Sequence, residues 1–258
     1  MVRVIAIANQ KGGVGKTTTS VNLAASLAAT KRRVLLIDLD PQGNASMGSG
    51  INKNEVETSA FDVLVDNMPL QEALIKSNES GYSVVASNVD LTAAEVHLLE
   101  RPEREKVLKS AIASVESDFD YVLIDCPPSL NMLTINALVA AQSILIPMQC
   151  EYYALEGLSA LMDTINKIRA TLNPNLVIEG LLRTMYDPRN NLSQQVTEQL
   201  NTYFGDKVYR TVIPRNVRLA EAPSHGLPVL HYDKTSKGAQ AYLALAGEML
   251  RREQAVTV

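Results

Sequence analysis

The most constraining feature of the sequence is a glycine-rich stretch, KGGVGKTT at residues 11–18, which lies between an apolar run and a helical pattern. The apolar run at 2–9 interleaves β-branched residues with alanine, as strands buried on both faces do. Residues 17–30 place apolar side chains at helical spacing and are followed by cations at 31–33. A strand, a glycine loop and a helix in this order predict the opening unit of a parallel sheet.

The alternation of strand and helix patterns continues along the chain. Further strands are predicted at 34–39, 121–125, 143–148 and 176–185, and a short one at 82–86. Helices are predicted at 102–115, 130–141, 153–172, 192–203 and 236–252, and short ones at 61–65 and 70–76. We therefore expect an α/β fold, a doubly wound and mostly parallel sheet with helices on both faces, with right-handed crossovers.

Length and composition favour one ordinary globular domain. The 258 residues are 46% hydrophobic and 20% charged, which suits a single domain over 1–258 with a frayed tail at 251–258. Cys126 and Cys150 are isolated, without metal-ligand spacing, so we expect a reducing, cytoplasmic setting and no zinc site. The net charge is −4, yet residues 183–252 carry ten Lys/Arg against six Asp/Glu. The carboxyl third is mildly basic.

The glycine-rich stretch has the chemistry of a phosphate-binding loop. Its glycines let successive backbone N–H groups converge on anionic oxygens, and the helix that follows adds the positive end of its dipole. Lys16 would reach the β- and γ-phosphates of a nucleotide, and the Thr17 hydroxyl would bind Mg²⁺. The common pattern GxxxxGK[ST] is not met, because Gln10 stands where its first glycine belongs. The alternative is a glycine-rich turn with a surface lysine.

With Lys11 and the glycine pair after it, this loop resembles the deviant phosphate loop (deviant Walker A) of the ParA/MinD superfamily, and the chain is most similar to its ParA/Soj branch. The resemblance implies a P-loop ATPase that binds ATP and Mg²⁺ through Lys11, Gly12, Gly13, Val14, Gly15, Lys16, Thr17 and Thr18. It also implies a homodimer in the ATP state, in which Lys11 reaches the phosphates of the partner's nucleotide. A cation at that place has no evident task within its own subunit once Lys16 is present.

Acidic residues follow two predicted strands at the edge where open α/β sheets bind ligands. After the strand at 34–39, either Asp38 or Asp40 is expected in the crevice, and the alternative is a simple turn former. By resemblance, Asp40 orients or activates the attacking water, and Asp38 helps to hold the Mg²⁺ environment. Asp125 ends the strand at 121–125 like a Walker B aspartate and would bind Mg²⁺ through a water.

The nucleotide base is assigned only through the resemblance. The segment IPRNVRLAEAPSHG at 213–226 is similar to the adenine-side segment of the family. There Pro214 packs on the base, Asn216 hydrogen-bonds its edge, and Met185 lies against the other face. From the residues alone, this segment is a loop punctuated by prolines.

The resemblance also implies nonspecific binding of double-stranded DNA by the ATP dimer, in association with the nucleoid. Arg189 and Arg218 match DNA-contact positions of the family, and Lys234, Lys237, Arg251 and Arg252 are further candidates. The alternative for each is an ordinary solvated charge. Because no arginine finger is evident, we expect slow hydrolysis that a ParB-like centromere-binding protein accelerates.

Two other branches share the phosphate loop. A scaffold of the MinD type would act on a membrane or a protein cargo, but the apolar stripe at 239–252 has few flanking cations, so packing against the domain explains it better. We therefore expect no stable membrane association. Iron–sulfur carriers bridge a cluster between subunits through cysteines, and Cys126 lacks a suitably placed second cysteine.

Overall fold

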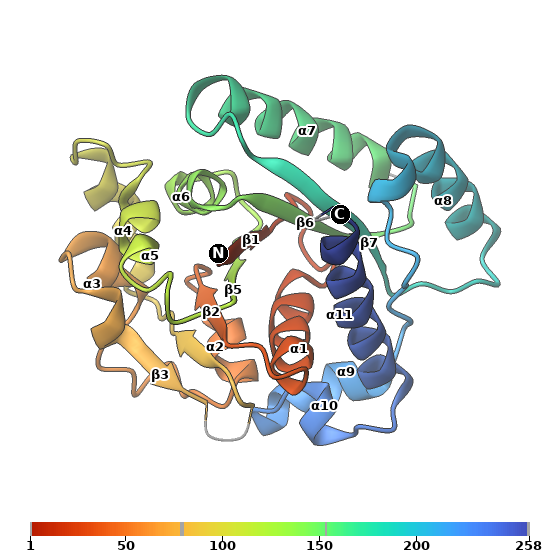
Figure 1. The fold of residues 1–258 in the computed structure, drawn as a ribbon, viewed down its shortest axis with the longest axis horizontal. Coiled ribbons are helices and arrows are strands. Elements are labelled where there is room, and N and C mark those ends of the chain that lie inside the picture. The colour runs from red at the N-terminus through yellow and green to blue at the C-terminus, as the bar shows by residue number, and fades with distance from the viewer. Residues whose placement is uncertain (1, 78–79, 153, 257–258) are drawn as a thin grey trace.

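The protein folds around one seven-stranded sheet. The structure is a computed structural model that describes residues 2–77, 80–152 and 154–256. The strand order is β3-β4-β2-β5-β1-β6-β7, and every neighbouring pair is parallel except β3 with β4 (Figure 1). The strands are β1 (Arg3–Ile7), β2 (Val34–Asp38), β3 (Leu74–Lys76), β4 (Ser83–Val85), β5 (Tyr121–Asp125), β6 (Ser143–Gln149) and β7 (Val177–Thr184).

Helices cover both faces of the sheet. The helices are α1 (Lys16–Ala29), α2 (Asn44–Gly48), α3 (Ala60–Val65), α4 (Leu91–Leu99), α5 (Val107–Ala113), α6 (Met132–Ala140), α7 (Ala154–Thr171), α8 (Asn191–Phe204), α9 (Val217–Glu221), α10 (Val229–Tyr232) and α11 (Lys237–Val256). Three short 3₁₀ turns complete them: η1 (Leu70–Ala73), η2 (Gly205–Lys207) and η3 (Ala222–His225). The doubly wound, mostly parallel α/β fold expected from the sequence is confirmed.

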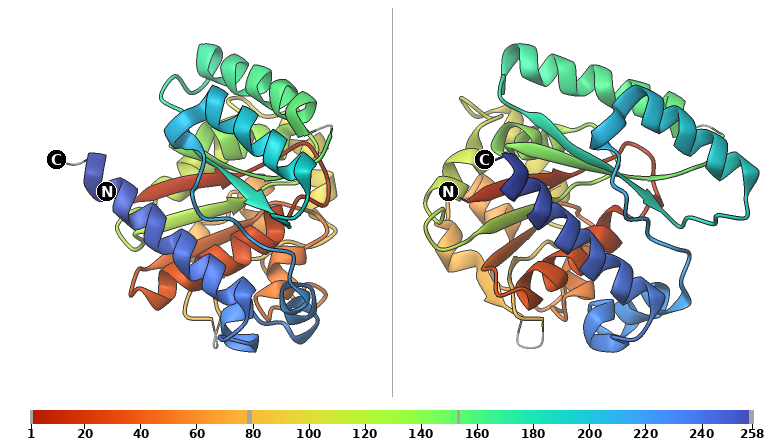
Figure 2. Two further views of the ribbon diagram at one scale, coloured as in Figure 1. Left: turned by 90° about the vertical axis from the view of Figure 1, so that its right-hand side faces the viewer. Right: turned by 45° about the vertical axis from the view of Figure 1, so that its right-hand side comes forward.

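Two separate apolar cores lie on the two faces because successive strand residues point to opposite sides. On β2, Leu35 and Ile37 join the core under α3 to α8, whereas Val34 and Leu36 join the core under α1, α2 and α9 to α11. Figures 1 and 2 show the second group gathered beside α1, with α11 running along it. The buried strands explain why their sequences read as continuous apolar runs.

The carboxyl ends of the central strands meet at one edge of the sheet. In the parallel pairing, Asp125 at the end of β5 lies opposite Asp38 of β2 and Ile7 of β1. The chain then enters α1 directly after the loop that follows β1. The acidic residues and the glycine loop therefore lie at the same edge, as the sequence predicted.

The long strands predicted after the first are confirmed within one residue at either end, but two predictions between them are wrong. Residues 70–76 are not one helical stretch: η1 ends at Ala73, and Leu74–Lys76 forms an antiparallel edge strand. Residues 102–115 do not form one helix either, and only Val107–Ala113 is helical. Pro102 disfavours a helical residue before it, and Glu103 takes a φ of +50°, so the chain turns between α4 and α5.

The last helix is longer than predicted and is packed into the domain. It continues to Val256, beyond the end predicted at residue 252. Tyr242, Leu245 and Ala246 of its apolar stripe are buried, which confirms that the stripe packs inside the protein. Residue 153, at the start of a predicted helix, and residues 257–258, at the end of the tail predicted to fray, lie outside the described residues.

Polar contacts join α11 to the segment after β7 and to the start of β1. The Glu248 carboxylate accepts hydrogen bonds from the backbone N–H groups of Arg210 and Thr211, at 2.9 and 2.8 Å. Arg3 at the start of β1 pairs with Glu179 and Glu253, each at 2.5 Å. None of the helices in the described ranges combines the length and apolar character needed to cross a bilayer.

We predict that Gly180→Ala, in β7, lowers the free energy of unfolding by about 2 kcal/mol, because an added methyl group would overpack the core. A β-carbon there would clash with the buried Tyr209 ring and lie 2.9 Å from the Lys207 carbonyl oxygen. Gly157→Ala, in α7, is the control. Among the described residues, nothing lies within 4 Å of a β-carbon at Gly157, so alanine there should raise the free energy of unfolding by about 0.5 to 1 kcal/mol. Urea unfolding measures both, and equal stability of the two variants would contradict this packing.

Candidate functional site

The loop between β1 and α1 has the geometry of an anion cradle. Gly13 and Gly15 have φ values of +72° and +84°, in the left-handed region that favours glycine. No acidic residue lies in the first turn of α1, and no side chain caps its N-terminus. Among the described residues, nothing lies within 4 Å of a β-carbon built at Gly12 or Gly13, which leaves room for a ligand beside the loop. These features leave the backbone N–H groups of a helix start available to phosphate.

The end of β7 holds this loop from the side. The Thr184 hydroxyl donates to the Val14 carbonyl oxygen at 2.7 Å, and the Thr184 side chain lies 3.7 Å from where a β-carbon on Gly15 would be. Thr184 is buried. The shape of the loop is therefore fixed by a strand distant in sequence as well as by its own glycines.

The two lysines of the loop have different surroundings. Lys16 is buried, and its Nζ donates to the Lys11 carbonyl oxygen at 3.2 Å. Burial lowers the pKa of Lys16, although the nearby Asp125 opposes this shift. The Lys11 side chain is 37% exposed and pairs with Glu151, after β6, with Nζ to Oε2 at 2.7 Å. Lys16 therefore faces the loop, whereas Lys11 is held at the surface by an exposed carboxylate.

Asp125 and Asp38 form a buried pair of carboxyl groups on adjacent strands. Asp125 accepts hydrogen bonds from the hydroxyls of Thr17 and Ser20, at 2.8 and 2.7 Å. Asp38 accepts from the Ser46 N–H and hydroxyl, at 2.8 and 2.7 Å. Burial raises the pKa of both groups above the ordinary aspartate range, and the mutual repulsion of the carboxyls adds to the shift of Asp125.

Asp40 lies at the mouth of the site, where it is only partly buried. Its backbone N–H donates to Asp38 Oδ1 at 3.1 Å, and its own Oδ1 accepts from the Gln42 N–H at 2.9 Å. Its carbonyl oxygen accepts from the Ser87 hydroxyl at 2.7 Å. The sequence left open which aspartate reaches the crevice. Asp38 is fully buried, whereas Asp40 is partly exposed.

The donor set suits a hard divalent cation that brings other ligands with it. Within the described residues, no group of three or more His, Cys, Asp or Glu side chains converges to form a metal cage. Thr17 and Asp125, which contact each other, instead offer one hydroxyl and one carboxylate beside the phosphate loop. Mg²⁺ commonly takes one or two protein oxygens and fills its remaining positions with phosphate and water. The Asp38 carboxylate accepts hydrogen bonds from Ser46 and Asp40, so Asp38 would support the metal site without binding the ion directly.

Two of the three residues expected at the base, Met185 and Pro214, belong to paired segments at the end of β7. Tyr186, next to Met185, forms a parallel bridge with Pro214, and Tyr186 N–H donates to the Ile213 carbonyl oxygen at 3.0 Å. Met185 has a φ of +47°, which is strained for a residue with a side chain, and its sulfur accepts from Gln149 Nε2 at 2.6 Å. Strained residues of this kind gather at ligand sites.

Asn216 carries an unsatisfied polar atom at the start of α9. Its Oδ1 is buried and accepts no hydrogen bond from the described residues. A β-carbon added at Gly238 of α11 would lie 3.0 Å from this oxygen and 2.7 Å from Leu219. An orphaned buried acceptor indicates a missing donor. The close approach of α11 fixes where the Asn216 amide sits.

The basic residues expected to contact DNA divide into two groups. Arg189 pairs with Asp187 at 2.8 Å, and Arg218 pairs with Glu221 at 2.7 Å. Arg252 is engaged most fully, with Glu248 at 2.8 Å and the Tyr209 ring centroid at 4.0 Å. The remaining candidates are exposed and form no ion pair within the described ranges, namely Lys234, Lys237 and Arg251.

Sequence reasoning missed several residues that organise the site, and Thr184 is one of them. Ser20 has a detectable signal, because it lies one helical turn beyond Lys16 and Thr17 on the same helix. Glu151 is the acidic residue after a third predicted strand, so the rule that identified Asp40 and Asp125 applies to it as well. Ser46 and Gly238 carry no comparable signal, because their roles arise only from contacts made in the folded chain.

Comparisons with known proteins agree with this geometry. The family model described as an AAA domain matches residues 2–178. The sporulation initiation inhibitor protein Soj of Bacillus subtilis is 54% identical over 249 residues, covering 96% of this chain and 98% of Soj. The chromosome partitioning protein ParA of Caulobacter vibrioides is 52% identical over 255 residues, covering 98% and 96%.

A solved structure matches at the level of the fold as well as the sequence. The cobyrinic acid a,c-diamide synthase of Mycobacterium smegmatis, with bound ADP and magnesium, superposes with a TM-score of 0.86 at 38% identity. The match covers 98% of this chain and 96% of that one. A chain of this fold therefore holds a magnesium nucleotide.

We predict that Asp125→Asn stabilises the metal-free protein at neutral pH. Because its pKa is raised, Asp125 binds its proton more tightly in the folded state than in the unfolded state. The free energy of unfolding of the wild-type protein therefore falls as pH rises above the ordinary carboxyl pKa of about 3.9. In EDTA at neutral pH, the variant should gain on the order of 2 kcal/mol in unfolding free energy, and the gain should shrink toward pH 4.

Asp120→Asn is the opposite control for this measurement. Hydrogen bonds from Arg33 hold the pKa of Asp120 below its usual range, so its loss should destabilise the protein at neutral pH. Denaturant unfolding at several pH values measures both variants. If the free energies of unfolding of the wild-type and Asp125→Asn proteins changed with pH in parallel, burial of the Asp125 carboxylate would not destabilise the folded state.

Proposed function

Because this chain belongs to the ParA/Soj family of chromosome-partitioning ATPases, we propose that it binds ATP with Mg²⁺, dimerises on it, holds DNA nonspecifically as the dimer, and releases the DNA after slow hydrolysis. The observation that carries the proposal is the different placement of two lysines in one loop. Lys16 is buried against the loop, and Lys11 is held at the surface by Glu151.

Nucleotide binding follows from the charges at the edge of the sheet. The phosphates would lie over the N–H groups of residues 12–18, with Lys16 beside the β- and γ-phosphates. Mg²⁺, held by Thr17 and by Asp125 through water, would neutralise phosphate charge. The unpartnered Asn216 oxygen supports a hydrogen bond from the amino group of adenine, and Met185 and Pro214 would then lie against the faces of the base. We therefore propose ATP as the nucleotide.

Hydrolysis would take place at the mouth of the site. Asp40 keeps one carboxylate oxygen free of hydrogen bonds within the described residues, and this oxygen can orient a water and receive its proton. The water oxygen bonds to the γ-phosphorus while the bond to the β–γ bridging oxygen breaks, which yields ADP and inorganic phosphate. Asp38 positions this carboxylate through the Asp40 N–H.

Dimerisation would use Lys11. Four or so negative charges on a triphosphate exceed what Lys16 and one divalent ion balance, and a lysine from a second copy supplies the missing charge. To reach the nucleotide of the second copy, Lys11 must break its ion pair with Glu151. This pair is exposed, and exposed ion pairs contribute at most about 1 kcal/mol. ATP can therefore displace this contact at small cost, whereas ADP offers less charge in return.

The DNA surface would consist of Arg189, Arg218, Lys234, Lys237 and Arg251. Arg252 is engaged by Glu248 and Tyr209, which suits it to holding α11 in place. Pairing of two copies would bring both sets onto one face and multiply weak phosphate contacts. A ParB-like centromere-binding protein would accelerate hydrolysis, in a cytoplasmic cycle on the nucleoid. A MinD-like membrane role is disfavoured because the apolar side of α11 is buried.

We predict that Lys11→Ala binds ATP within about threefold of wild type but stays monomeric, because only the contact across the interface is lost. Sedimentation velocity with MgATP measures the monomer fraction, and fluorescent nucleotide titration measures binding. Lys16→Ala should lose nucleotide binding altogether. Lys109→Ala, an exposed lysine on α5, removes the same charge elsewhere and should dimerise normally. Normal ATP-dependent dimerisation of Lys11→Ala would contradict the proposed role.

We predict that Arg189→Glu with Arg218→Glu weakens DNA binding at least tenfold while the ATP dimer persists. Each lost phosphate contact also flattens the salt dependence of binding by about one unit of logarithmic slope. Gel shifts on nonspecific duplex with ATP, ADP or no nucleotide measure retention. Lys109→Glu with Lys167→Glu makes the same charge change on other exposed helices. If both double variants lost DNA equally, total charge rather than a defined surface would be responsible.

A further inference from the structure

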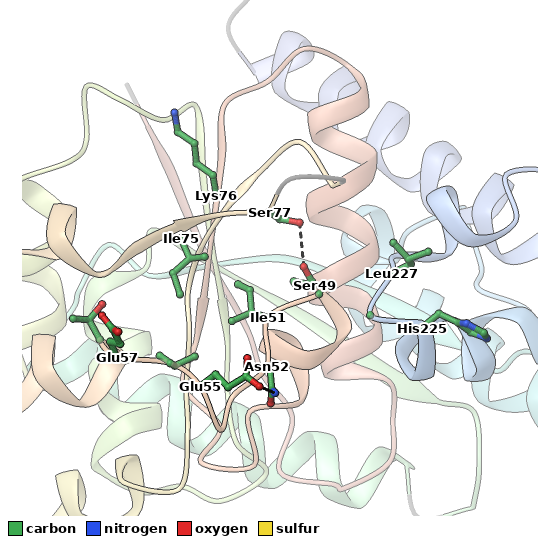
Figure 3. A pocket seen from close by; sticks show the side chains of 14 residues that line it. Ser49, Ile51, Asn52, Glu55, Glu57, Ile75, Lys76, Ser77, His225 and Leu227 are labelled. Atoms are coloured by element: carbon green, nitrogen blue, oxygen red, sulfur yellow. Dashed lines mark hydrogen bonds between the residues drawn. The ribbon is translucent and has the colours of Figure 1, made fainter.

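A cavity of about 660 Å³ lies away from the phosphate loop, between the end of α2, the edge strand β3 and the turn after η3. It is lined by residues 49–52, 55–58, 75–77 and 225–227, and we call it the edge pocket (Figure 3). None of the residues assigned above to phosphate, metal, base or DNA lines it. Its volume lies in the range of ligand-binding pockets, about 300 to 1,000 Å³.

One wall of the edge pocket is the outermost strand of the sheet. β3 pairs only with β4, in an antiparallel register that places Lys76 opposite Ser83. The Ser77 N–H donates to the Tyr82 carbonyl oxygen at 3.1 Å. Bonded and non-bonded positions alternate in such a ladder, so the backbone N–H and C=O of Lys76 point away from β4. An exposed strand edge of this kind is a template for another extended segment.

The pocket combines apolar side chains with carboxylates. Ile51, Ile75 and Leu227 are partly buried and line its interior. Glu55 and Glu57 are exposed at its rim, and within the part of the chain that the structure describes, Glu55 accepts a hydrogen bond from the neutral Asn52 amide, at 2.7 Å. Glu57 forms no ion pair among the described residues. The rim is therefore negative where it is accessible.

Lys76 and His225, which also line the pocket, lie apart from these carboxylates. In Figure 3, the Lys76 side chain points away from Glu55 and Glu57, on the opposite side of β3 from Ile75. His225 is turned toward Tyr232, with which it stacks at 4.8 Å between ring centroids. Neither group lies between the two carboxylates. An occupant with a positive charge and an apolar side chain would complement the site.

We propose that the edge pocket docks an extended peptide segment of a partner protein, in which a lysine or arginine alternates with an apolar residue. The segment would pair with the open backbone edge of Lys76, place its apolar side chain against Ile51 and Ile75, and place its cation beside Glu57. Main-chain pairing supplies affinity in this mode, and the alternate side chains supply selectivity.

The site is connected to the nucleotide edge through α2. Ser46 in α2 holds the Asp38 carboxylate, and α2 ends at Gly48, directly before Ser49 and Gly50 of the pocket lining. Gly50 approaches Gly226 so closely that a β-carbon on Gly226 would lie 3.0 Å from the Gly50 α-carbon. A docked segment would touch both sides of this contact. Docking of the segment does not rest on the proposed function.

The test is fluorescence anisotropy with a labelled, end-capped octapeptide in which arginine and valine alternate, without nucleotide. We expect saturable binding to wild type, at least tenfold weaker binding to Glu57→Lys and to Ile75→Arg, and unchanged binding to Glu116→Lys, which makes the same charge reversal at an exposed position outside the pocket lining. A peptide alternating glutamate and valine should not bind. Circular dichroism confirms that each variant is folded.

Backbone pairing is tested with two N-methylated forms of the arginine peptide, methylated at the arginines or at the valines. Strand addition uses only one edge of the peptide, so one form should lose binding and the other keep it. Equal binding of both forms, equal loss in Glu57→Lys and Glu116→Lys, or no binding to wild type would overturn the proposal. ATP-dependent dimerisation, measured separately, would remain intact in each of these outcomes, so failure here is distinct from failure of the proposed function.

Discussion

The matched register of β2 and β5 is the constraint on which the rest of the structure depends, because it ends two neighbouring parallel strands on aspartates that face each other. Two buried carboxyl groups lose hydration and repel one another, so they hold charge only where cations lie close by. Lys16 is one such cation, and it is itself buried. The edge of the sheet is therefore costly as an isolated surface and well suited to a charged ligand with a divalent ion.

Short polar contacts turn this edge into a defined geometry. Thr17 and Ser20 fix Asp125 from the first turns of α1, and Ser46 fixes Asp38 from α2. Each aspartate is thus hydrogen-bonded to a helix beside the site. A change in the charge next to an aspartate would therefore also act on the helix bonded to it. Shortly after α2, Gly50 contacts Gly226, and this contact joins the amino-terminal half of the chain to the segment that carries Asn216.

Much of the fold was predictable because buried parallel strands must be apolar on both faces. The long strands, the position of the aspartates at their ends, and the glycine loop before α1 all follow from local sequence. β3 was not predictable in this way, because a three-residue edge strand leaves no periodic pattern. The turn at 100–106 was missed because the predicted helix began at Pro102, whereas α5 begins only at Val107.

Within the site, local motifs identified the residues that would touch phosphate and metal, but not the residues that hold them. The Lys11–Glu151 pair joins positions 140 residues apart, and Gly238 meets Asn216 only because α11 packs over α9. Such partners are set by the folded chain, so no spacing in the sequence reports them. The resemblance to a family supplied the base contacts and the idea of a second subunit, and the structure supplied the contact that holds Lys11 in the single chain.

The most direct measurement is an experimental structure of the Asp40→Ala protein with MgATP, in which hydrolysis is blocked. The account predicts two copies face to face, with the Lys11 ammonium moved from Glu151 to the phosphates of the partner's nucleotide. A single copy with nucleotide bound at Lys16 and Lys11 still paired to Glu151 would contradict it.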